Sequence, residues 1–471
     1  MLTATVETIA RVTGGELLVG DPSLIANDVS IDSRSATPGC VFFALRGERS
    51  DGHDHLIGAL QMGARVAVVE RPSADLAEQI AAAAAAGAAV VRVAAVEKAL
   101  ANLATWHRSR LHCTVVGVTG SNGKTTTKDF LCAALGASRR VVATEGNRNN
   151  ELGVPLTVMR AGADTDVLIV EMGMRGLGQI ASLARIARPD VGLVTNVGVT
   201  HVEVLGSQDA IASAKGELVE AIGPEGTVYL NGDDAYTHVL QGKSRAPVVT
   251  YGLSDGCDVR AADIVMDEQS RPGFDIVAGE LRAHVDLPVP GRHNAYNALA
   301  ATAVALGLGV PLDEVASQLA CAETTGMRME SFTTAAGVTV INDAYNASPS
   351  SMHFAVETLS GFSAARRRIA VLGDMAELGS LTELAHFDIG ELVARSSIDI
   401  LVTVGPKASR IADGARAEGM DADVVRPCAT AEEALEVLDD VVERGDVVLV
   451  KASRVMGLER VVEGMVDPRV G

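Results

Sequence analysis

Aromatic residues are scarce in this chain. Phe, Trp and Tyr make up 3% of its 471 residues, and Trp106 is the single tryptophan. Such a chain offers few rings on which nucleic-acid bases could stack, so an aromatic base-binding platform is not expected. Hydrophobic residues nevertheless make up 48% of the sequence, so its cores must be built from Ala, Val, Leu and Ile.

A positive balance of charge and long apolar runs are also missing. The formal net charge is −20, which is the opposite of what a general nucleic-acid binder needs, and an anionic ligand would require a local positive site. The longest apolar run, residues 81–91, is far shorter than the roughly 20 residues that cross a bilayer. The N-terminus shows no basic segment followed by an apolar one. We therefore expect a soluble, cytoplasmic protein without membrane insertion.

Cysteines are few and scattered, and no two form a Cys-x-x-Cys pair. This spacing argues against a metal knuckle or a disulfide framework and favours a reducing compartment. The six are Cys40, Cys113, Cys132, Cys257, Cys321 and Cys428.

The length predicts several domains, because ordinary domains contain roughly 100–200 residues. We divide the chain into segments 1–110, 111–325 and 326–471, with a linker at 322–327. The first is expected to end in a helix near 74–86, a strand at 88–93 and a helix at 96–109.

The two later segments alternate apolar strands with helical patterns, which predicts an α/β fold with parallel sheets. Residues 259–289 instead alternate in short strands, as at an antiparallel edge, and a helix is expected at 294–306. The expected parallel strands are 114–119, 167–172, 191–197 and 228–231 in the second segment and 338–342, 368–372, 400–404 and 447–450 in the third.

The strongest motif lies at residues 117–127, GVTGSNGKTTT. It follows a predicted strand and begins a predicted helix, 124–135, so backbone amides and the helix N-terminus would face phosphate oxygens. Lys124 would reach the β- and γ-phosphates, and the Thr125 hydroxyl would ligate Mg²⁺. Val118 stands where the full P-loop pattern has Gly, so only the shorter form, G-x-x-G-K-T, fits. The motif predicts ATP binding, against the alternative of a structural Gly-rich turn.

Polar residues follow the strands at the same edge of the predicted sheet, where ligands bind in open α/β folds. Glu171 ends one strand and is a good candidate for Mg²⁺, which prefers oxygen ligands. His201 lies beyond the next strand, and a histidine there is more often structural than a ligand. Lys215 would ordinarily be a solvated surface lysine. Asn294 could either cap the following helix or read a nucleotide base.

The third segment carries three polar clusters directly after predicted strands, at 342–346, 373–375 and 451–454. One such cluster would be an ordinary loop. Three of them on the carboxyl side of strands indicate a binding edge. On residues alone the prediction is an ATP-using, multidomain α/β enzyme.

Several motifs resemble the Mur ligases, the ATP-dependent amide-bond-forming enzymes of peptidoglycan synthesis, over nearly the whole chain. They are GSNGKTTT at 120–127, GNRNNELGVP at 146–155, NDAYNASP at 342–349 and VLGDMAELG at 371–379, together with DSR at 32–34 and DGH at 51–53. The last two are similar to the uridine-nucleotide-binding part of the family. The Asp-Asn-Pro-Arg tetrapeptide typical of the diamino-acid-adding member is absent, which favours the dipeptide-adding member.

This resemblance implies three domains: a small N-terminal α/β domain for the UDP end of the substrate, a central P-loop ATPase domain and a Rossmann-like C-terminal domain. It implies that Lys124 contacts phosphate, and that Thr125, Glu171 and His201 serve magnesium. Lys215 matches a position that is carbamylated in some members but not all. Met327 precedes Arg328 where many relatives have Gly.

The implied site residues form two sets. For ATP they are Gly120, Ser121, Asn122, Gly123, Lys124, Thr125, Thr126, Asn294, Arg328 and Asp343, with Lys124, His201 and Lys215 taken as catalytic. For the peptide substrates they are Ser33, Arg34, Asp51, His53, Asn147, Asn149, Asn150, Tyr345 and Asn346.

The implied reaction joins D-alanyl-D-alanine to UDP-N-acetylmuramoyl-tripeptide with ATP and Mg²⁺, in a monomeric enzyme. The base for the incoming amine is open, with Asp374 and Glu377 as candidates. The alternatives are the diamino-acid-adding ligase, a folylpolyglutamate-synthase-like ligase, a nucleotide switch, and a motor or transporter ATPase. No Asn-Lys-x-Asp signature of guanine-specific switches is present.

Overall fold

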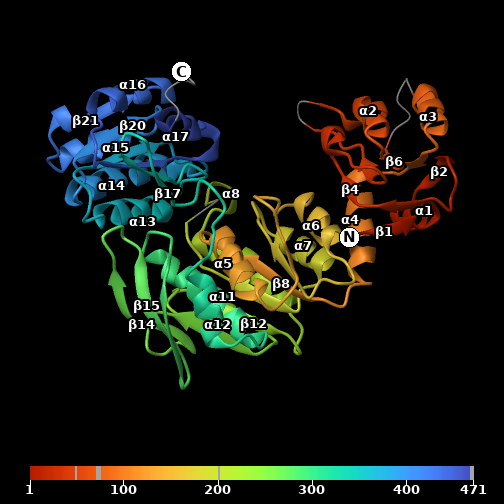
Figure 1. The fold of residues 1–471 in the computed structure, drawn as a ribbon, viewed down its shortest axis with the longest axis horizontal. Coiled ribbons are helices and arrows are strands. Elements are labelled where there is room, and N and C mark those ends of the chain that lie inside the picture. Colours follow the sequence, from red (N-terminus) through yellow and green to blue (C-terminus); the bar gives the residue numbers. More distant parts are fainter. Residues whose placement is uncertain (48–49, 71–75, 200–201, 467–471) are drawn as a thin grey trace.

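The computed structural model describes residues 1–47, 50–70, 76–199 and 202–466. The chain builds one large sheet in its middle and smaller sheets from its two ends. In Figure 1 the N-terminal part (red) and the C-terminal part (blue) lie at opposite ends of the molecule, with the central part between them. No helix of the described residues is long and apolar enough to cross a membrane.

The N-terminal part has a five-stranded sheet in the order β2-β7-β6-β5-β4 and a small pair, β1-β3. Its strands are β1 (Thr3–Thr5), β2 (Glu16–Val19), β3 (Ile25–Asn27), β4 (Val29–Ser30), β5 (Val41–Phe43), β6 (Val66–Val69) and β7 (Ala89–Arg92). The helices are α1 (Val6–Thr13), α2 (Leu56–Gln61), α3 (Leu76–Ala85) and α4 (Val96–Arg108), with 3-10 turns η1 (Ser33–Ser35) and η2 (Gly52–His55).

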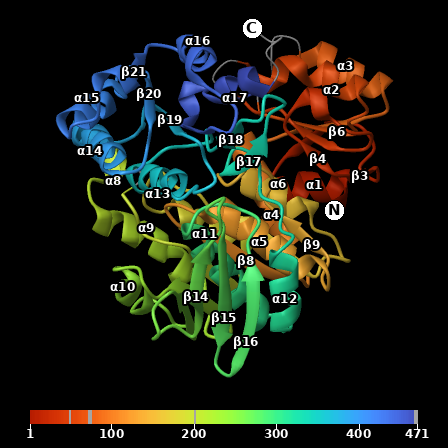
Figure 2. The same ribbon diagram turned by 60° about the vertical axis from the view of Figure 1, so that its left-hand side comes forward.

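The central sheet has nine strands in the order β16-β15-β14-β13-β12-β11-β8-β10-β9. They are β8 (Thr114–Thr119), β9 (Val141–Ala143), β10 (Val167–Glu171), β11 (Val191–Val194), β12 (Thr227–Asn231), β13 (Val248–Gly252), β14 (Val259–Met266), β15 (Pro272–Ala278) and β16 (Leu281–Asp286). Every pair from β9 to β14 is parallel, and β14-β15-β16 is antiparallel, so the predicted antiparallel edge is confirmed. Both views show this edge projecting away from the two outer sheets (Figure 1 and Figure 2).

Eight helices accompany the described part of this sheet. They are α5 (Lys124–Gly136), α6 (Gly153–Arg160), α7 (Gln179–Ala187), α8 (Val202–Leu205), α9 (Gln208–Ala221), α10 (Thr237–Gln241), α11 (His293–Gly307) and α12 (Leu312–Leu319). The predicted strand 191–197 was too long. The chain leaves the sheet after Val194 because the Thr195 hydroxyl and the Asn196 amide turn to hydrogen-bond the carbonyl of Asn122.

The C-terminal sheet has the order β17-β18-β22-β19-β20-β21, parallel except for the β17–β18 pair. Its strands are β17 (Glu330–Thr333), β18 (Thr339–Asn342), β19 (Arg368–Gly373), β20 (Ile400–Val404), β21 (Val425–Cys428) and β22 (Val447–Lys451). Its helices are α13 (Pro349–Ser360), α14 (Thr382–Arg395), α15 (Ser409–Ala417), α16 (Ala431–Val441) and α17 (Glu459–Val466), with 3-10 turns η3 (Gly379–Leu381), η4 (Ala422–Val424) and η5 (Arg454–Met456).

Helix α13 packs the C-terminal part onto the central part. Met352 and Val356 of α13 belong to the same apolar cluster as Phe130 of α5 and Leu299 of α11, and all four are fully buried. Burial of apolar surface of this kind contributes about 25 cal/mol of stabilising free energy for each Å² removed from water. Residues 321–329 between the two parts contain no helix or strand, and the predicted linker lies within them. The Thr325 amide donates to Asp129 Oδ2 of α5 at 2.8 Å, which fixes this segment to the P-loop helix.

Candidate active site

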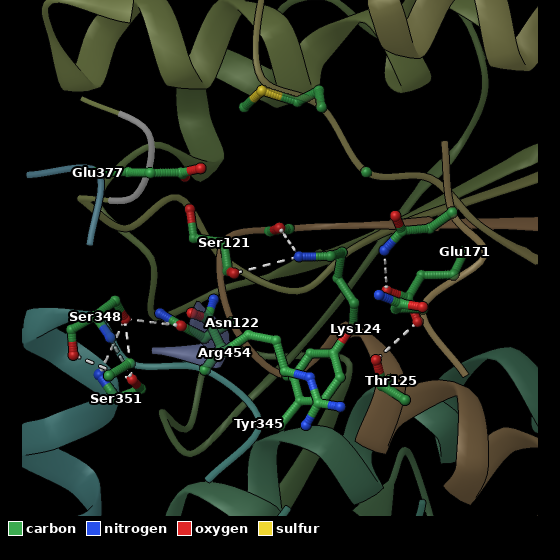
Figure 3. Close-up of a pocket in the computed structure, with 18 of the residues that line it drawn as sticks. Ser121, Asn122, Lys124, Thr125, Glu171, Tyr345, Ser348, Ser351, Glu377 and Arg454 are labelled. Carbon is green, nitrogen blue, oxygen red and sulfur yellow. Dashed lines mark hydrogen bonds between the residues drawn. The ribbon is translucent and has the colours of Figure 1, made fainter. Parts of the chain in front are cut away.

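The predicted phosphate loop joins β8 to α5 (Figure 3). Gly120 and Gly123 have φ of 151° and 79°, in the region that favours glycine. A Cβ at Gly120 would collide with the Thr195 hydroxyl, and one at Gly123 would collide with the Asn297 amide oxygen. Gly123 is also the N-cap of α5, so the first amides of that helix open onto the cleft. Both glycines are therefore required by the geometry of the turn.

Lys124 is folded back onto its own loop. Its Nζ donates to the carbonyl of Gly120 at 2.8 Å and to that of Ser121 at 3.3 Å. Burial lowers the pKa of the Lys124 ammonium, the nearby charge of Glu171 raises it, and Arg328 lowers it further. These carbonyls hold the ammonium at the mouth of the loop, within reach of a phosphate bound on the same amides.

Glu171 lies at the end of β10 and is 1% exposed. Its Oε2 accepts from the Thr125 hydroxyl at 2.8 Å, and its Oε1 accepts from the Asn149 amide at 2.7 Å. The Glu171 backbone amide donates to the Thr144 hydroxyl at 3.0 Å, which fixes the strand end. Neither hydrogen-bond partner of the carboxylate is a cation. The predicted pair of oxygen donors, Thr125 and Glu171, is thus assembled at the N-terminus of α5.

Lys215 is on α9 and is only 2% exposed, so the ordinary interpretation as a solvated lysine is wrong. The helix turns this side chain inward to the cleft, where it lies near Lys124 and Asp234. Burial, followed by repulsion from Lys124, holds the pKa of Lys215 well below its usual value. Within the described ranges, its ammonium forms no hydrogen bond or ion pair. His201, the other predicted metal-site residue here, lies outside the described residues.

Asn294 does not cap α11. Arg292 is the N-cap, without a side-chain hydrogen bond, and the helix already begins at His293. Because Asn294 is therefore inside the first turn and faces inward, its amide donates to the Pro290 carbonyl at 2.7 Å and accepts from Asn297 at 2.9 Å. Asn297 in turn accepts from the Thr127 hydroxyl at 3.2 Å, so these amides connect α11 to the P-loop helix.

Across the cleft, the C-terminal part presents a cation and an aromatic ring together. The Arg328 guanidinium lies 4.0 Å from the centre of the Tyr345 ring. Asp343 Oδ1 accepts from the Met329 amide at 3.2 Å, which positions the segment carrying Arg328. Met327 has a φ of 61°, a left-handed conformation that favours glycine.

Sequence reasoning missed two residues that line the cleft, Lys451 on the C-terminal side and His293 on the central side. Lys451 ends β22, is 2% exposed, and donates from Nζ to Asp343 Oδ2 at 2.6 Å and to the Asn346 carbonyl at 2.9 Å. His293 stacks on Phe354 of α13 with ring centres 5.2 Å apart. Lys451 belonged to a recognised strand-end cluster, and that was the available signal. The stacking of His293 depends on a partner 61 positions away, which no local pattern reveals.

One cleft of about 1290 Å³ collects these groups. Its lining includes the P-loop and both central-part candidates, Glu171 and Lys215. The predicted strand-end clusters at 342–346 and 451–454 also contribute to it, whereas the cluster at 373–375 does not, and the residues that reach the cavity after β19 are 376–378. From the predicted ATP and peptide sets, the cleft is lined by Gly120, Ser121, Asn122, Gly123, Lys124, Thr125, Thr126, Asn147, Asn149, Asn150, Asn294, Arg328, Asp343, Tyr345 and Asn346.

The N-terminal candidates do not line this cleft. Arg34 is exposed and pairs with Asp32, whose pKa this hydrogen bond lowers to about 2. His53 is buried: its Nδ1 lies 2.6 Å from Asp51 Oδ1, and its Nε2 accepts from the Glu70 amide at 3.0 Å. Both ring nitrogens of His53 are engaged, so it holds the Asp51 turn in place. Ser33 begins the turn that Asp32 caps.

The candidates for the amine base differ in position. Asp374 Oδ1 accepts from the backbone amides of Lys407 and Ala408 at 3.0 and 2.7 Å, and Asp374 does not line the cleft. Glu377 does line the cleft and lies 3.7 Å from Arg175. Asp374 therefore anchors the loop before α15, and of the two carboxylates only Glu377 reaches the cavity.

Family models match three successive parts of the chain: "Mur ligase family, catalytic domain" at 26–108, "Mur ligase middle domain" at 118–305 and "Mur ligase, glutamate ligase domain" at 327–454. A UDP-N-acetylmuramoyl-tripeptide–D-alanyl-D-alanine ligase of Mycobacterium bovis is 40% identical over 501 aligned positions, covering 99% of this chain and 98% of the relative. The chain belongs to the Mur ligase family.

Solved Mur ligases superpose over most of this length. MurF from Acinetobacter baumannii has a TM-score of 0.87 at 29% identity, covering 99% of both chains. MurF ligase from Thermotoga maritima in complex with ADP has a TM-score of 0.78 at 29% identity, covering 93% of this chain and 96% of that one.

Proposed function

We propose that this Mur ligase joins D-alanyl-D-alanine to UDP-N-acetylmuramoyl-tripeptide, converting ATP to ADP and phosphate. The observation that carries the proposal is the full-length similarity to a ligase of that name, combined with a P-loop that opens into the cleft between the central and C-terminal parts. The product would be the UDP-N-acetylmuramoyl-pentapeptide of peptidoglycan biosynthesis.

The chemistry follows from the poor reactivity of a carboxylate. Its oxide is a poor leaving group, so the terminal carboxylate of the tripeptide first takes the γ-phosphoryl group of ATP and releases ADP. The neutral amine of the dipeptide then attacks this acyl phosphate, an amide forms, phosphate leaves and the amine loses a proton. Phosphoryl transfer depends mainly on positioning and charge neutralisation. The chain's contribution is therefore to hold two anions together and to keep water out.

The cleft supplies local positive charge in a protein whose net charge is −20. The backbone amides of residues 123–126 and the Lys124 ammonium would cradle the triphosphate. On the opposite wall Arg328 and Asp343 would hold the adenosine end, with Asn294 on the central side. The similarity to a structure in complex with ADP supports nucleotide binding at this place.

Thr125 and Glu171 fit a magnesium site. Both offer oxygen donors, and the two oxygens already lie 2.8 Å apart without a cationic partner. No group of three or more His, Cys, Asp or Glu side chains that could hold a metal occurs in the described ranges, so phosphate oxygens would complete the coordination, with His201 as a further candidate. The ion would neutralise charge that develops on the phosphoryl group during transfer.

The peptide-bearing substrate would span the N-terminal and central parts. Ser33, Arg34, Asp51 and His53 mark the proposed uridine end, and Asn147, Asn149 and Asn150 line the cleft toward the reacting carboxylate. Tyr345 and Asn346 would contact the incoming dipeptide. We retain 1–110, 111–325 and 326–471 as the proposed domains of a cytoplasmic monomer.

The test is a product assay on purified protein. Phosphate release and the mass of the nucleotide product are measured with UDP-N-acetylmuramoyl-tripeptide plus D-alanyl-D-alanine, and with UDP-N-acetylmuramoyl-dipeptide plus a diamino acid. We expect phosphate and pentapeptide only with the first pair. Turnover with the second pair would identify the diamino-acid-adding activity, and phosphate release independent of both peptides would contradict the ligase proposal.

A further inference from the structure

Asn122 is the P-loop residue that touches the C-terminal part of the chain. Its Nδ2 donates to Ser350 Oγ at 2.9 Å. Its Oδ1 accepts from Ser348 Oγ at 3.1 Å, a contact that Figure 3 shows. Because the amide gives one hydrogen bond and takes another, it fits only a partner that presents two hydroxyls in this arrangement. The two serines belong to the start of α13, more than 220 positions further along the chain.

The backbone of Asn122 also forms hydrogen bonds, with residues that directly follow β11 of the central sheet. Its amide donates to Asn196 Oδ1 at 3.0 Å, and its carbonyl accepts from Thr195 Oγ1 at 2.6 Å and from Asn196 Nδ2 at 3.0 Å. The neighbouring Ser121 exchanges hydrogen bonds with the backbone of Gly198. The segment after β11 and the start of α13 therefore both hydrogen-bond to Asn122, the first through its backbone and the second through its side chain.

The partner surface on α13 is rigid. Ser348 is the N-cap of the helix, forms a capping box with Ser351, and is followed by Pro349 at the first helical position. Further along, Phe354 stacks on His293, and the amide of Ala364 donates to the Glu268 carbonyl at 3.3 Å. Neither of these later contacts involves a P-loop residue, whereas the contact with Asn122 is made by the loop that would hold phosphate.

Lys124 links this contact to nucleotide. In the structure its ammonium is bound to the carbonyls of Gly120 and Ser121, immediately before Asn122. Moving this ammonium onto a phosphate releases both carbonyls and changes the hydrogen bonding of the peptide units that position Asn122. Nucleotide bound at the P-loop and the start of α13 can therefore influence each other through Asn122.

We propose that Asn122 is a positioning residue that couples nucleotide occupancy of the P-loop to docking of α13, and that Ser350 is its partner. The proposal rests on the ligase function inferred above. Docking closes the cleft over the acyl phosphate, so losing the Asn122–Ser350 bond would let water compete with the dipeptide amine. The signature is a failure of coupling between phosphate release and amide formation, which a merely structural role would not produce.

Ser350→Ala tests this in the full-length enzyme, with amide product and phosphate measured in the same reaction. We expect the ratio of phosphate to amide to rise and kcat for amide formation to fall, by roughly fivefold as for one lost hydrogen bond. The affinity for ATP should also fall, because a docked α13 that nucleotide favours must in turn favour bound nucleotide. Ser350→Thr keeps the hydroxyl and should restore a ratio near that of the wild type. The matched control is Ser409→Ala, at the start of α15, where the serine hydroxyl donates to the Pro406 carbonyl at 2.7 Å.

Asn122→Leu gives a second, independent arm, since its side chain is close in size but can exchange hydrogen bonds with neither Ser348 nor Ser350. Asn122→Leu and Ser350→Ala should be non-additive in the phosphate-to-amide ratio. An unchanged ratio in Ser350→Ala, or additive effects in the double variant, would overturn the coupling. A wild-type enzyme without dipeptide-dependent phosphate release would instead overturn the proposed function.

Discussion

The Thr125 hydroxyl donates to Glu171 Oε2 at 2.8 Å, joining the first turn of α5 to the end of β10. These residues are 46 positions apart, and the register of β8 with β10 brings them together by pairing Glu171 with Val118. Glu171 is 1% exposed, and its second oxygen is occupied by Asn149. The carboxylate is therefore fixed in direction by two neutral donors, as a metal ligand needs to be.

Glu171→Gln should weaken magnesium binding, because it removes the negative charge of a proposed ligand. The fold should stay intact, because the amide oxygen of Gln can still accept from the Thr125 hydroxyl. We expect kcat to fall by about 10²-fold and the magnesium concentration needed for half-maximal activity to rise. A magnesium titration of kcat checks this. Glu151→Gln, an acidic residue that lines the same cleft without contacting Thr125, is the comparison. An unaltered magnesium requirement in Glu171→Gln would show that the ion is held elsewhere.

Lys124→Ala should abolish ATP-dependent amide formation with the fold retained. Among the described residues, the Lys124 side chain donates to two carbonyls of its own loop, so its loss should cost little folding stability. Without the ammonium, however, the repulsion between the triphosphate and the substrate carboxylate would not be offset. We expect a loss of about 10²–10³-fold in kcat, with circular dichroism and thermal melting close to wild type. Near-normal turnover would remove the central assumption about this loop.

Much of the central part could be predicted because its signals are local. The strand 114–119 was predicted with its observed bounds, and the helix after the P-loop to within one residue. The turn from strand to helix needs Gly at 120 and 123, and the phosphate-binding pattern records that need directly in the sequence.

Long-range packing accounts for what the sequence could not reveal. Whether Lys215 is solvated depends on which face α9 turns to the cleft, and Asn294 lost its capping role because α11 starts one residue earlier than expected. The contact of Asn122 with Ser350 joins two parts of the chain whose docking no periodicity encodes. The N-terminal residues were placed by resemblance, and their roles remain predictions.

Lys215 should carry a carbamate in the active enzyme. Burial, and then repulsion from Lys124, lowers the pKa of Lys215 and so raises the share of neutral amine, which can add carbon dioxide to form a carbamate and release a proton. The new anion would lie near the Lys124 ammonium. We expect activity to fall in buffer stripped of carbon dioxide and to return with bicarbonate, with a carbamate carbon signal in the NMR spectrum of protein labelled with carbon-13 bicarbonate.

Lys215→Arg should be inactive, and Lys98→Arg, on the exposed face of α4, should behave as wild type. Full activity without carbon dioxide would refute the modification.

His293 should make the enzyme sensitive to acid. Burial lowers its pKa from 6.5 to about 4, while Asp343 raises it and Lys451 lowers it further. Between these two values the unfolded chain binds a proton that the folded chain does not, so stability falls as pH drops from about 6.5 to about 4, by on the order of 2 kcal/mol. Protonation would also bury a charge where α11 meets α13, and the cost of desolvating this charge would oppose docking of the C-terminal part. His293→Phe keeps an aromatic ring and cannot titrate, so the difference between its melting temperatures at pH 7 and pH 5 should be smaller than in the wild type.

The control is His238→Gln, on the exposed side of α10, which should retain the wild-type difference in melting temperature. If His293→Phe loses as much stability on acidification as the wild type, the acid sensitivity has another origin.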